Sequence, residues 1–142
     1  MEALEKLKPL ALLLARLALG IIYMYHGYPK LFGQTANVQQ FFVRHGLPAS
    51  WVYIAGVLEL FGGGLLILGL FTRVVGLLLT LEMGVAIWKV HLAHGIMSVK
   101  DYEFPLALGV AAFLLASAGA GMVSLDYPLF HGKTKGKSKA KA

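Results

Sequence analysis

Three ionisable residues, Arg16, Glu59 and Glu82, lie within stretches of sequence that are otherwise almost entirely apolar. An ionised side chain deep in a lipid bilayer costs about 2.5–3.5 kcal/mol on insertion scales, so such residues usually face the interior of a helix bundle and pair. The helical rise places Arg16 about 9 Å, Glu82 about 12 Å and Glu59 about 16 Å from one end of the helices. We therefore expect one arginine and two glutamates to meet in the core.

Pairing one arginine with two glutamates leaves one carboxyl group without a cation. In an apolar medium such a group favours its neutral form, which can exchange a proton with a ligand. We interpret Arg16, Glu59 and Glu82 as candidate catalytic residues of a proton-handling or polar-ligand site. The alternative, that the three residues only hold three helices together, stays open at the level of sequence.

A second group of ionisable residues lies near the opposite end of the helices and comprises His26, Lys30, Lys89, His91, His94 and Glu103. We interpret His26, Lys30, Lys89 and His91 as candidate binding residues for an anion, or for the head of a quinone or phenol. Side chains that only reach the membrane surface are the alternative. His91 and His94, three residues apart, could hold a metal with His26 and Glu103. Lys89 would repel a cation, so we predict no metal site.

The composition is that of a membrane protein. Of the 142 residues, 58% are hydrophobic and 14% are charged, whereas about a quarter of residues are charged in soluble domains. Four stretches reach the roughly 20 residues that cross a bilayer, namely residues 9–28, 50–71, 73–91 and 104–122. No series of alternating segments suggests a membrane barrel. We predict an all-α integral membrane four-helix bundle, a single domain over residues 1–130.

Small residues and one amphipathic segment add detail to this bundle. Gly56 and Gly63 share a face of the second helix, and Ala112, Ala116 and Ala120 form a row on the fourth. Such rows let helix backbones approach closely in a membrane, within one chain or between two copies. Residues Val38, Phe41 and Phe42 share a helical face, which predicts a short interfacial helix between the first two spans. An ordered polar loop is the alternative there.

The distribution of lysine and arginine predicts the orientation. Lys6, Lys8, Arg73 and five lysines after residue 132 lie on one side of the predicted spans, and the side richer in these residues is usually cytoplasmic. We therefore expect a multi-pass protein of the plasma membrane with both termini in the cytoplasm. Residues 131–142 read as a disordered basic tail against anionic lipid. Since the net charge of +6 is concentrated in this tail, we expect no nucleic-acid partner.

Motifs in the first three spans resemble the DoxX family of small bacterial and archaeal membrane proteins, from about residue 10 to 125. The first span has the run 16–20 (RLALG) and ends in 26–31 (HGYPKL); the second has 59–65 (ELFGGGL) and then 69–73 (GLFTR). The third contains the mid-helix acid Glu82. The matched positions are Arg16, His26, Lys30, Glu59, Gly63 and Arg73.

The resemblance implies a four-helix membrane bundle associated with respiratory redox chemistry. One branch of the family supplies the membrane subunit of a thiosulfate:quinone oxidoreductase, and other members accompany thiol or superoxide-detoxifying enzymes. Because this chain has no cysteine, it cannot relay electrons through a thiol of its own.

Three functions fit these patterns. The first is a redox-associated subunit, in which a quinone or similar phenol binds in the bundle and Glu59 or Glu82 exchanges protons with it. The second is a membrane anchor that recruits a soluble oxidoreductase through its tail and interfacial helix. The third is a small-solute transporter, for which four helices leave little room unless the chain forms homo-oligomers. Whether the chain is itself an enzyme is not decided by the sequence.

Overall fold

The computed structural model describes residues 1–131, apart from the side chains of residues 93 and 94. The helices are α1 (Glu2–Lys6), α2 (Lys8–Leu31), α3 (Thr35–Arg44), α4 (Trp51–Leu68), α5 (Thr72–Lys89), the 3-10 helix η1 (His91–His94), α6 (Val99–Ala118) and α7 (Asp126–His131). No strand occurs in this part of the chain. The predicted all-α fold is therefore confirmed.

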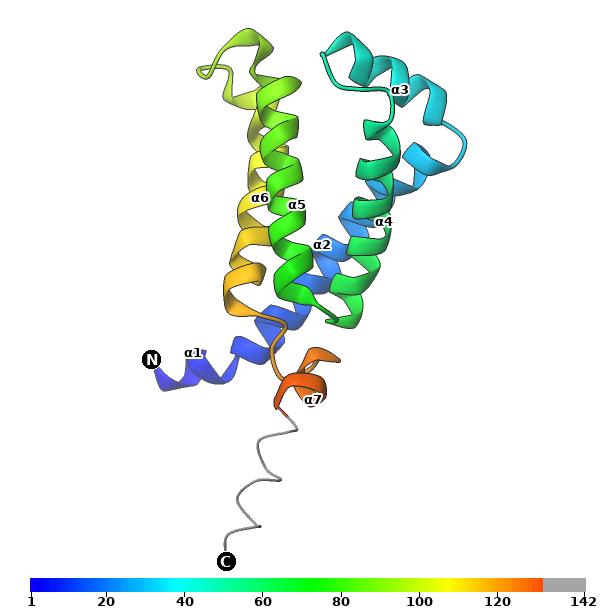
Figure 1. The fold of residues 1–142 in the computed structure, drawn as a ribbon. Helices are drawn as coiled ribbons and strands as arrows, with labels where there is room; N and C mark the ends of the chain where they lie inside the picture. Colours follow the sequence, from blue (N-terminus) through cyan, green and yellow to red (C-terminus); the bar gives the residue numbers. More distant parts are fainter. Residues whose placement is uncertain (132–142) are drawn as a thin grey trace, which may run out of the picture.

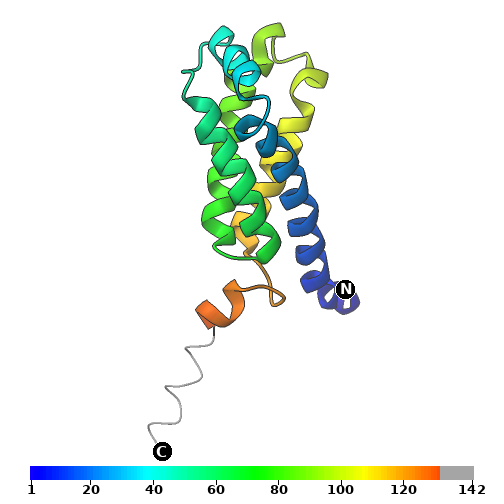
Figure 2. The same cartoon turned by 90° about the vertical axis from the view of Figure 1, so that its right-hand side faces the viewer.

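Four long helices run side by side and form two closely packed pairs, α2 with α4 and α5 with α6. In Figure 1 the two pairs meet toward the lower end and separate toward the upper end. Helix α3 lies across the upper end against α4, whereas α1 and α7 lie at the lower end (Figures 1 and 2). The beginning of the chain and the last described helix are thus at the same end of the bundle, as expected from the sequence.

Glycines bring α2 and α4 into backbone contact. A β-carbon added to Gly20 would lie 2.6 Å from the carbonyl oxygen of Gly63, and one added to Gly27 would lie 2.5 Å from the amide nitrogen of Leu60. Gly56 similarly packs against Lys30 and Leu31. Glycines that repeat every seven residues on both helices allow this approach. In a membrane, helix contacts of this kind are stabilised by van der Waals packing, because lipid supplies no hydrophobic driving force. The predicted small-residue face of the second span is confirmed.

The second pair is also joined by small residues. A β-carbon on Gly76 of α5 would lie 2.7 Å from the carbonyl oxygen of Ala112 on α6. The hydroxyl of Thr80 donates to the Gly76 carbonyl at 2.7 Å and also lies 3.3 Å from the Gly109 carbonyl on α6. Ala112 is fully buried, and Ala116 lies against the same glycine. Of the row predicted on the fourth span, Ala112 and Ala116 form a seam within the chain, whereas Ala120 lies beyond the end of α6.

Three of the helices, α2, α4 and α6, are long and apolar enough to cross a membrane. The fourth long helix, α5, matches α4 in length but carries Arg73, Glu82 and Lys89. Each of the four nevertheless presents large apolar side chains outward, among them Ile21, Phe61, Leu81 and Leu114, which are 60–61% exposed. Such a surface suits contact with lipid tails. That α5 also crosses the membrane stays a prediction, which this outward surface supports.

The helix boundaries differ from the predicted spans by up to five residues, most at the start of α6. Helix α4 ends at Leu68 and is followed by Gly69, whose φ is 67°, and α5 begins at Thr72, so the predicted tight hairpin is present. Helix α6 begins at Val99 and not near residue 104, and it ends at Ala118. Pro105 consequently lies inside α6 and not in its first turn. Because proline has no amide hydrogen, it cannot donate the usual helical bond to the carbonyl four residues earlier. The predicted helix between the first two spans is confirmed as α3.

Two adjacent glycines of α4 test the importance of the α2–α4 contact. A β-carbon on Gly63 would meet Gly20 and Met24, whereas one on Gly64 would have no atom within 4 Å. We expect Gly63→Ala to destabilise the protein by about 1–3 kcal/mol, the usual range for overpacking. The matched variant Gly64→Ala should unfold at or above the parent temperature, because alanine favours helix. Thermal unfolding in detergent measures both, and equal unfolding temperatures for the two variants would contradict the contact.

Candidate functional site

A large cavity lies between the upper halves of the two helix pairs. Its volume is about 1220 Å³, somewhat above the usual range for drug-sized ligands. Helices α2, α3, α4, α5 and α6 all contribute to its wall. Most lining side chains are apolar or aromatic, including Val38, Phe41, Phe42, Trp51, Met83, Phe104 and Leu108. A few polar groups interrupt this apolar wall, which is the usual construction of a small-molecule site.

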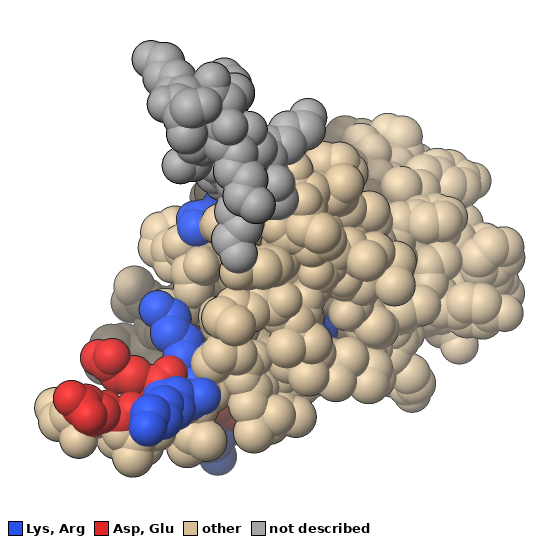
Figure 3. Space-filling model, turned by 90° about the horizontal axis from the view of Figure 1, so that it is seen from below, with Lys and Arg blue, Asp and Glu red and all other residues tan. Residues whose placement is uncertain are grey.

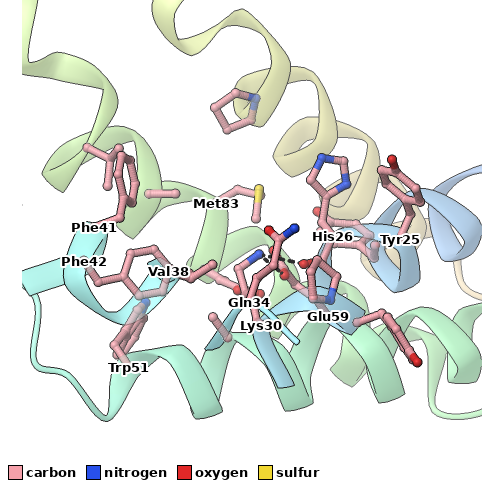
Figure 4. Close-up of a pocket in the computed structure, with 18 of the residues that line it drawn as sticks. Tyr25, His26, Lys30, Gln34, Val38, Phe41, Phe42, Trp51, Glu59 and Met83 are labelled. Carbon is pink, nitrogen blue, oxygen red and sulfur yellow. Dashed lines mark hydrogen bonds and ion pairs between the residues drawn. The ribbon is translucent and has the colours of Figure 1, made fainter. Parts of the chain in front are cut away.

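An ion pair between Lys30 and Glu59 forms part of the cavity wall. The Nζ atom of Lys30, near the end of α2, donates to the Oε2 atom of Glu59 on α4 and also to the carbonyl oxygen of His26 at 3.0 Å. Figure 4 shows the pair between the aromatic side chains Phe41, Phe42 and Trp51 on one side and His26 with Tyr25 on the other. Glu59 is 4% exposed, so its charge is compensated by Lys30 and not by water.

Glu82 and Tyr23 supply the buried polar atoms of the site that have no partner. Both residues line the cavity, and they are 7% and 1% exposed. Within the described part of the chain, neither the Oε2 atom of Glu82 nor the hydroxyl of Tyr23 has a hydrogen-bond partner. Since a buried polar atom without a partner costs about 1–3 kcal/mol, these two atoms are available to a ligand in the cavity.

Tyr23 was not among the residues expected to form a site. The signal was nonetheless present, because Tyr23 precedes Gly27 by four residues and Lys30 by seven, which places all three on one face of α2. In the sequence Tyr23 is one of three tyrosines, with Tyr25 and Tyr28, near the end of the first predicted span. Its burial in the bundle depends on how α2 is rotated about its own axis, which spacing along one helix does not fix.

Arg16 does not join the two glutamates, so the expected core triad is wrong. Its Nη2 atom donates to the carbonyl oxygen of Val123 at 2.5 Å, and its side chain packs against Gly69 below the end of α4. Arg16 precedes Lys30 by fourteen residues, about 21 Å of helix. The register that sets Gly20 against Gly63 and Gly27 against Glu59 brings Lys30, and not Arg16, to the glutamate.

Arg16 instead belongs to a set of contacts that closes the lower end. The carboxylate of Asp126 accepts from the amides of Phe71 and Thr72 at 2.7 and 2.9 Å, which caps the start of α5. Arg73 donates to the carbonyls of residues 116 and 117 at the end of α6. Each charge has the sign that suits the helix end it faces. Viewed from this end, charged side chains gather beside the start of the chain (Figure 3), where Glu2, Glu5, Lys6 and Lys8 are exposed.

The residues predicted to bind a ligand head are only partly brought together. His26, Lys30 and His91 all line the cavity. The Nδ1 atoms of His26 and His91 each lie 2.9 Å from a carbonyl oxygen of their own segment, Ile22 and Ala86. Lys89 is not one of the described residues that line the cavity. Its ammonium lies 4.3 Å from the centre of the Trp88 ring, whose side chain is 67% exposed.

The metal-binding alternative rested on His26, His91, His94 and Glu103. The side chain of His94 lies outside the described residues. In the part of the chain that the structure does describe, no three His, Cys, Asp or Glu side chains are grouped closely enough to hold a metal ion.

The fold and the cavity define a class: a small all-helical membrane protein with a ligand-sized cavity between two helix pairs. Comparison with known proteins identifies the family. The chain matches the DoxX family over residues 11–92, more than half of its length, and it belongs to that family.

Curated relatives match the chain over most of its length and most of their own. The chain is 37% identical over 128 residues to the Bacillus subtilis (strain 168) protein named "Putative oxidoreductase CatD", covering 90% of this chain and 93% of the relative. It is 31% identical to "Inner membrane protein YphA" of Escherichia coli (strain K12), covering 84% and 90%, and 32% identical to "Inner membrane protein YqjF" of the same organism, covering 87% and 95%. No solved structure matches the chain. These relatives and the three apolar helices support a location in the membrane.

The Lys30–Glu59 pair can be tested by removing its cation. Lys30→Met leaves the Glu59 carboxylate buried without a partner, so we expect a loss of about 1–3 kcal/mol in the free energy of unfolding. The double variant Lys30→Met/Glu59→Gln should recover part of this loss, because a neutral amide needs no cation. Denaturant or thermal unfolding in detergent measures the three proteins, and a double variant less stable than the single one would argue against a pair.

The placement of Arg16 leads to a separate prediction. Arg16→Met should remove a charged hydrogen bond worth about 1.5–3 kcal/mol and loosen the segment between α6 and α7. Limited proteolysis should then cut near residues 119–125 faster than in the parent protein. Ligand binding in the cavity should stay the same, since Arg16 lies about 21 Å of helix from Lys30. Lost binding with unchanged proteolysis would return Arg16 to the site.

Proposed function

We propose that the protein binds a neutral, lipid-soluble molecule with a polar aromatic head, a quinone or a similar phenol, in the cavity between the helix pairs. The observation that carries this proposal is the pair of buried polar atoms without partners, the Glu82 carboxyl and the Tyr23 hydroxyl, that face a large apolar cavity. Hydroxyl or carbonyl oxygens of a ligand head would complete their hydrogen bonds.

The charges around the cavity favour a neutral ligand. The Lys30 ammonium is taken up by Glu59 and by the His26 carbonyl, so it offers little to an anionic ligand. Glu82 adds a second acid beside this pair. A permanently anionic ligand would therefore face two carboxyl groups and one compensated cation. A neutral head with hydrogen-bonding oxygens meets no such repulsion.

Aromatic and apolar side chains would hold the rest of the ligand. Phe41, Phe42 and Trp51 form one wall, and the rings of His26 and Phe104, 5.4 Å apart, form another. Rings of this kind pack against a flat aromatic head in offset or edge-to-face geometry. The volume also leaves space for part of an apolar tail.

In this proposal, Glu59 and Glu82 bind and release the protons that accompany a change in the redox state of the ligand. A quinone supplies the electron chemistry when bound, and the protein supplies binding, orientation and proton exchange. Lys30 holds the charge of Glu59, and Tyr23 orients the ligand head. We expect the electrons to be exchanged with a partner oxidoreductase. The Bacillus subtilis relative is itself named a putative oxidoreductase, which supports a redox role but names no partner.

Fluorescence offers a direct test, because the chain has two tryptophans and only Trp51 lines the cavity. In a Trp88→Phe background, a short-tailed benzoquinone should quench Trp51 to saturation in detergent or nanodiscs. Glu82→Gln and Tyr23→Phe should each weaken binding about tenfold, equivalent to about 1.4 kcal/mol. This is the size expected for one buried hydrogen bond.

The matched control is Glu103→Gln, the same chemical change at an exposed glutamate of α6 that does not line the cavity. Its binding should equal that of the parent protein. If quenching by the quinone does not saturate, or if Glu82→Gln and Glu103→Gln bind the quinone with the same affinity, the cavity is not a quinone site.

A further inference from the structure

The cavity belongs entirely to one half of the bundle. Its wall on α2 begins at Tyr23 and continues to the end of the helix, and on α4 it runs from Trp51 to Glu59. On α5 it begins at Glu82, and on α6 it comprises Phe104, Pro105 and Leu108 in the first half of the helix. All of these segments lie toward the end that carries α3 and η1 (Figure 1).

The other half is filled by an apolar layer, here called the core plug and defined by Leu19, Leu66, Val75, Leu79, Ala112 and Leu115. These side chains are at most 6% exposed. Among the described residues, the buried polar or charged side chains are Arg16, Glu59, Thr72 and Glu82. None of them lies within the plug, because Arg16 and Thr72 lie at its lower edge and the two acids at its upper edge.

The plug is thick enough to oppose the passage of protons and ions. From Glu59 to the lower end of α4, and from Glu82 to the lower end of α5, the helical rise gives about 13–15 Å, roughly half of the hydrocarbon thickness of a bilayer. Glycine contacts close this region tightly, since α2 meets α4 at Gly20 and Gly63 and α5 meets α6 at Gly76. A proton or ion crossing such a layer meets no buried charged side chain among the described residues, and an unpaired charge there costs several kcal/mol.

We infer that Glu59 and Glu82 exchange protons with the aqueous phase on the α3 side only, through the cavity, and that the core plug isolates them from the side that carries α1 and α7. This inference rests on the proposed function for the identity of the ligand, but the one-sided water path is a property of the helix packing. It gives the site a direction across the membrane: protons released from a bound ligand leave toward α3.

The absence of cysteine makes this path measurable with single-cysteine variants. Ala86→Cys places a thiol on the cavity wall, and Ala112→Cys places one in the plug. Thr35→Cys at the start of α3 and Ser117→Cys at the end of α6 mark the two sides. A charged, membrane-impermeant thiol reagent is added to membrane vesicles of each orientation, and modification is read as a mass shift of the full-length protein. Only a hydrated thiol ionises and reacts.

We expect Ala86→Cys to be modified in the vesicles that expose Thr35→Cys and not in those that expose Ser117→Cys. Ala112→Cys should be modified in neither. Val75→Cys, a substitution of similar volume in the plug, provides the same measurement if Ala112→Cys does not accumulate. Modification of Ala86→Cys from the Ser117 side, or from neither side, would overturn the inference, as would modification of both plug positions.

The labelling result does not depend on a ligand. A one-sided path combined with failure of quinone binding would remove the proposed ligand and keep the sidedness. Saturable quinone binding combined with labelling of Ala86→Cys from both sides would keep the proposed ligand and remove the one-sided path.

Discussion

The close approach of α2 and α4 is the contact on which the rest of the structure depends. Gly20 against Gly63 and Gly27 against Glu59 and Leu60 fix the antiparallel register of the two helices. Once that register is set, Lys30 can only meet Glu59. A membrane offers no hydrophobic drive between helices, so backbone contact through small residues provides the specificity that water would otherwise supply.

Tight packing in one half allows an opening in the other. The two helix pairs are in contact through the core plug, and above it they separate enough to form a cavity of about 1220 Å³. The plug side chains pack the two pairs together below the site and do not line the cavity. This is an economical design for a small chain, because one apolar layer both stabilises the bundle and separates the site from one side of the membrane.

The lower end is built from charges that cap helix ends and hold segments of the chain together. Asp126 caps α5, Arg73 caps α6, and Arg16 holds the segment between α6 and α7. Arg16 is as deeply buried as Tyr23, yet the two residues serve opposite ends of the bundle. Burial of an ionisable group therefore shows that the group has a role. Only its contacts show whether that role is in folding or in binding a ligand.

The sequence by itself determined the all-helical fold, its membrane character, the small-residue seams and the short helix α3, because each of these follows from composition or from spacing along a single helix. It also singled out Glu59, Glu82, His26 and Lys30. Only the tertiary structure decided which of these residues meet. Depth along separate helices does not define partners, since a pairing depends on the register and rotation of one helix against another, and an error of two turns moves a side chain by about 11 Å. For that reason the sequence assigned Arg16 to the core site and Lys89 to the ligand head, and it did not single out Tyr23.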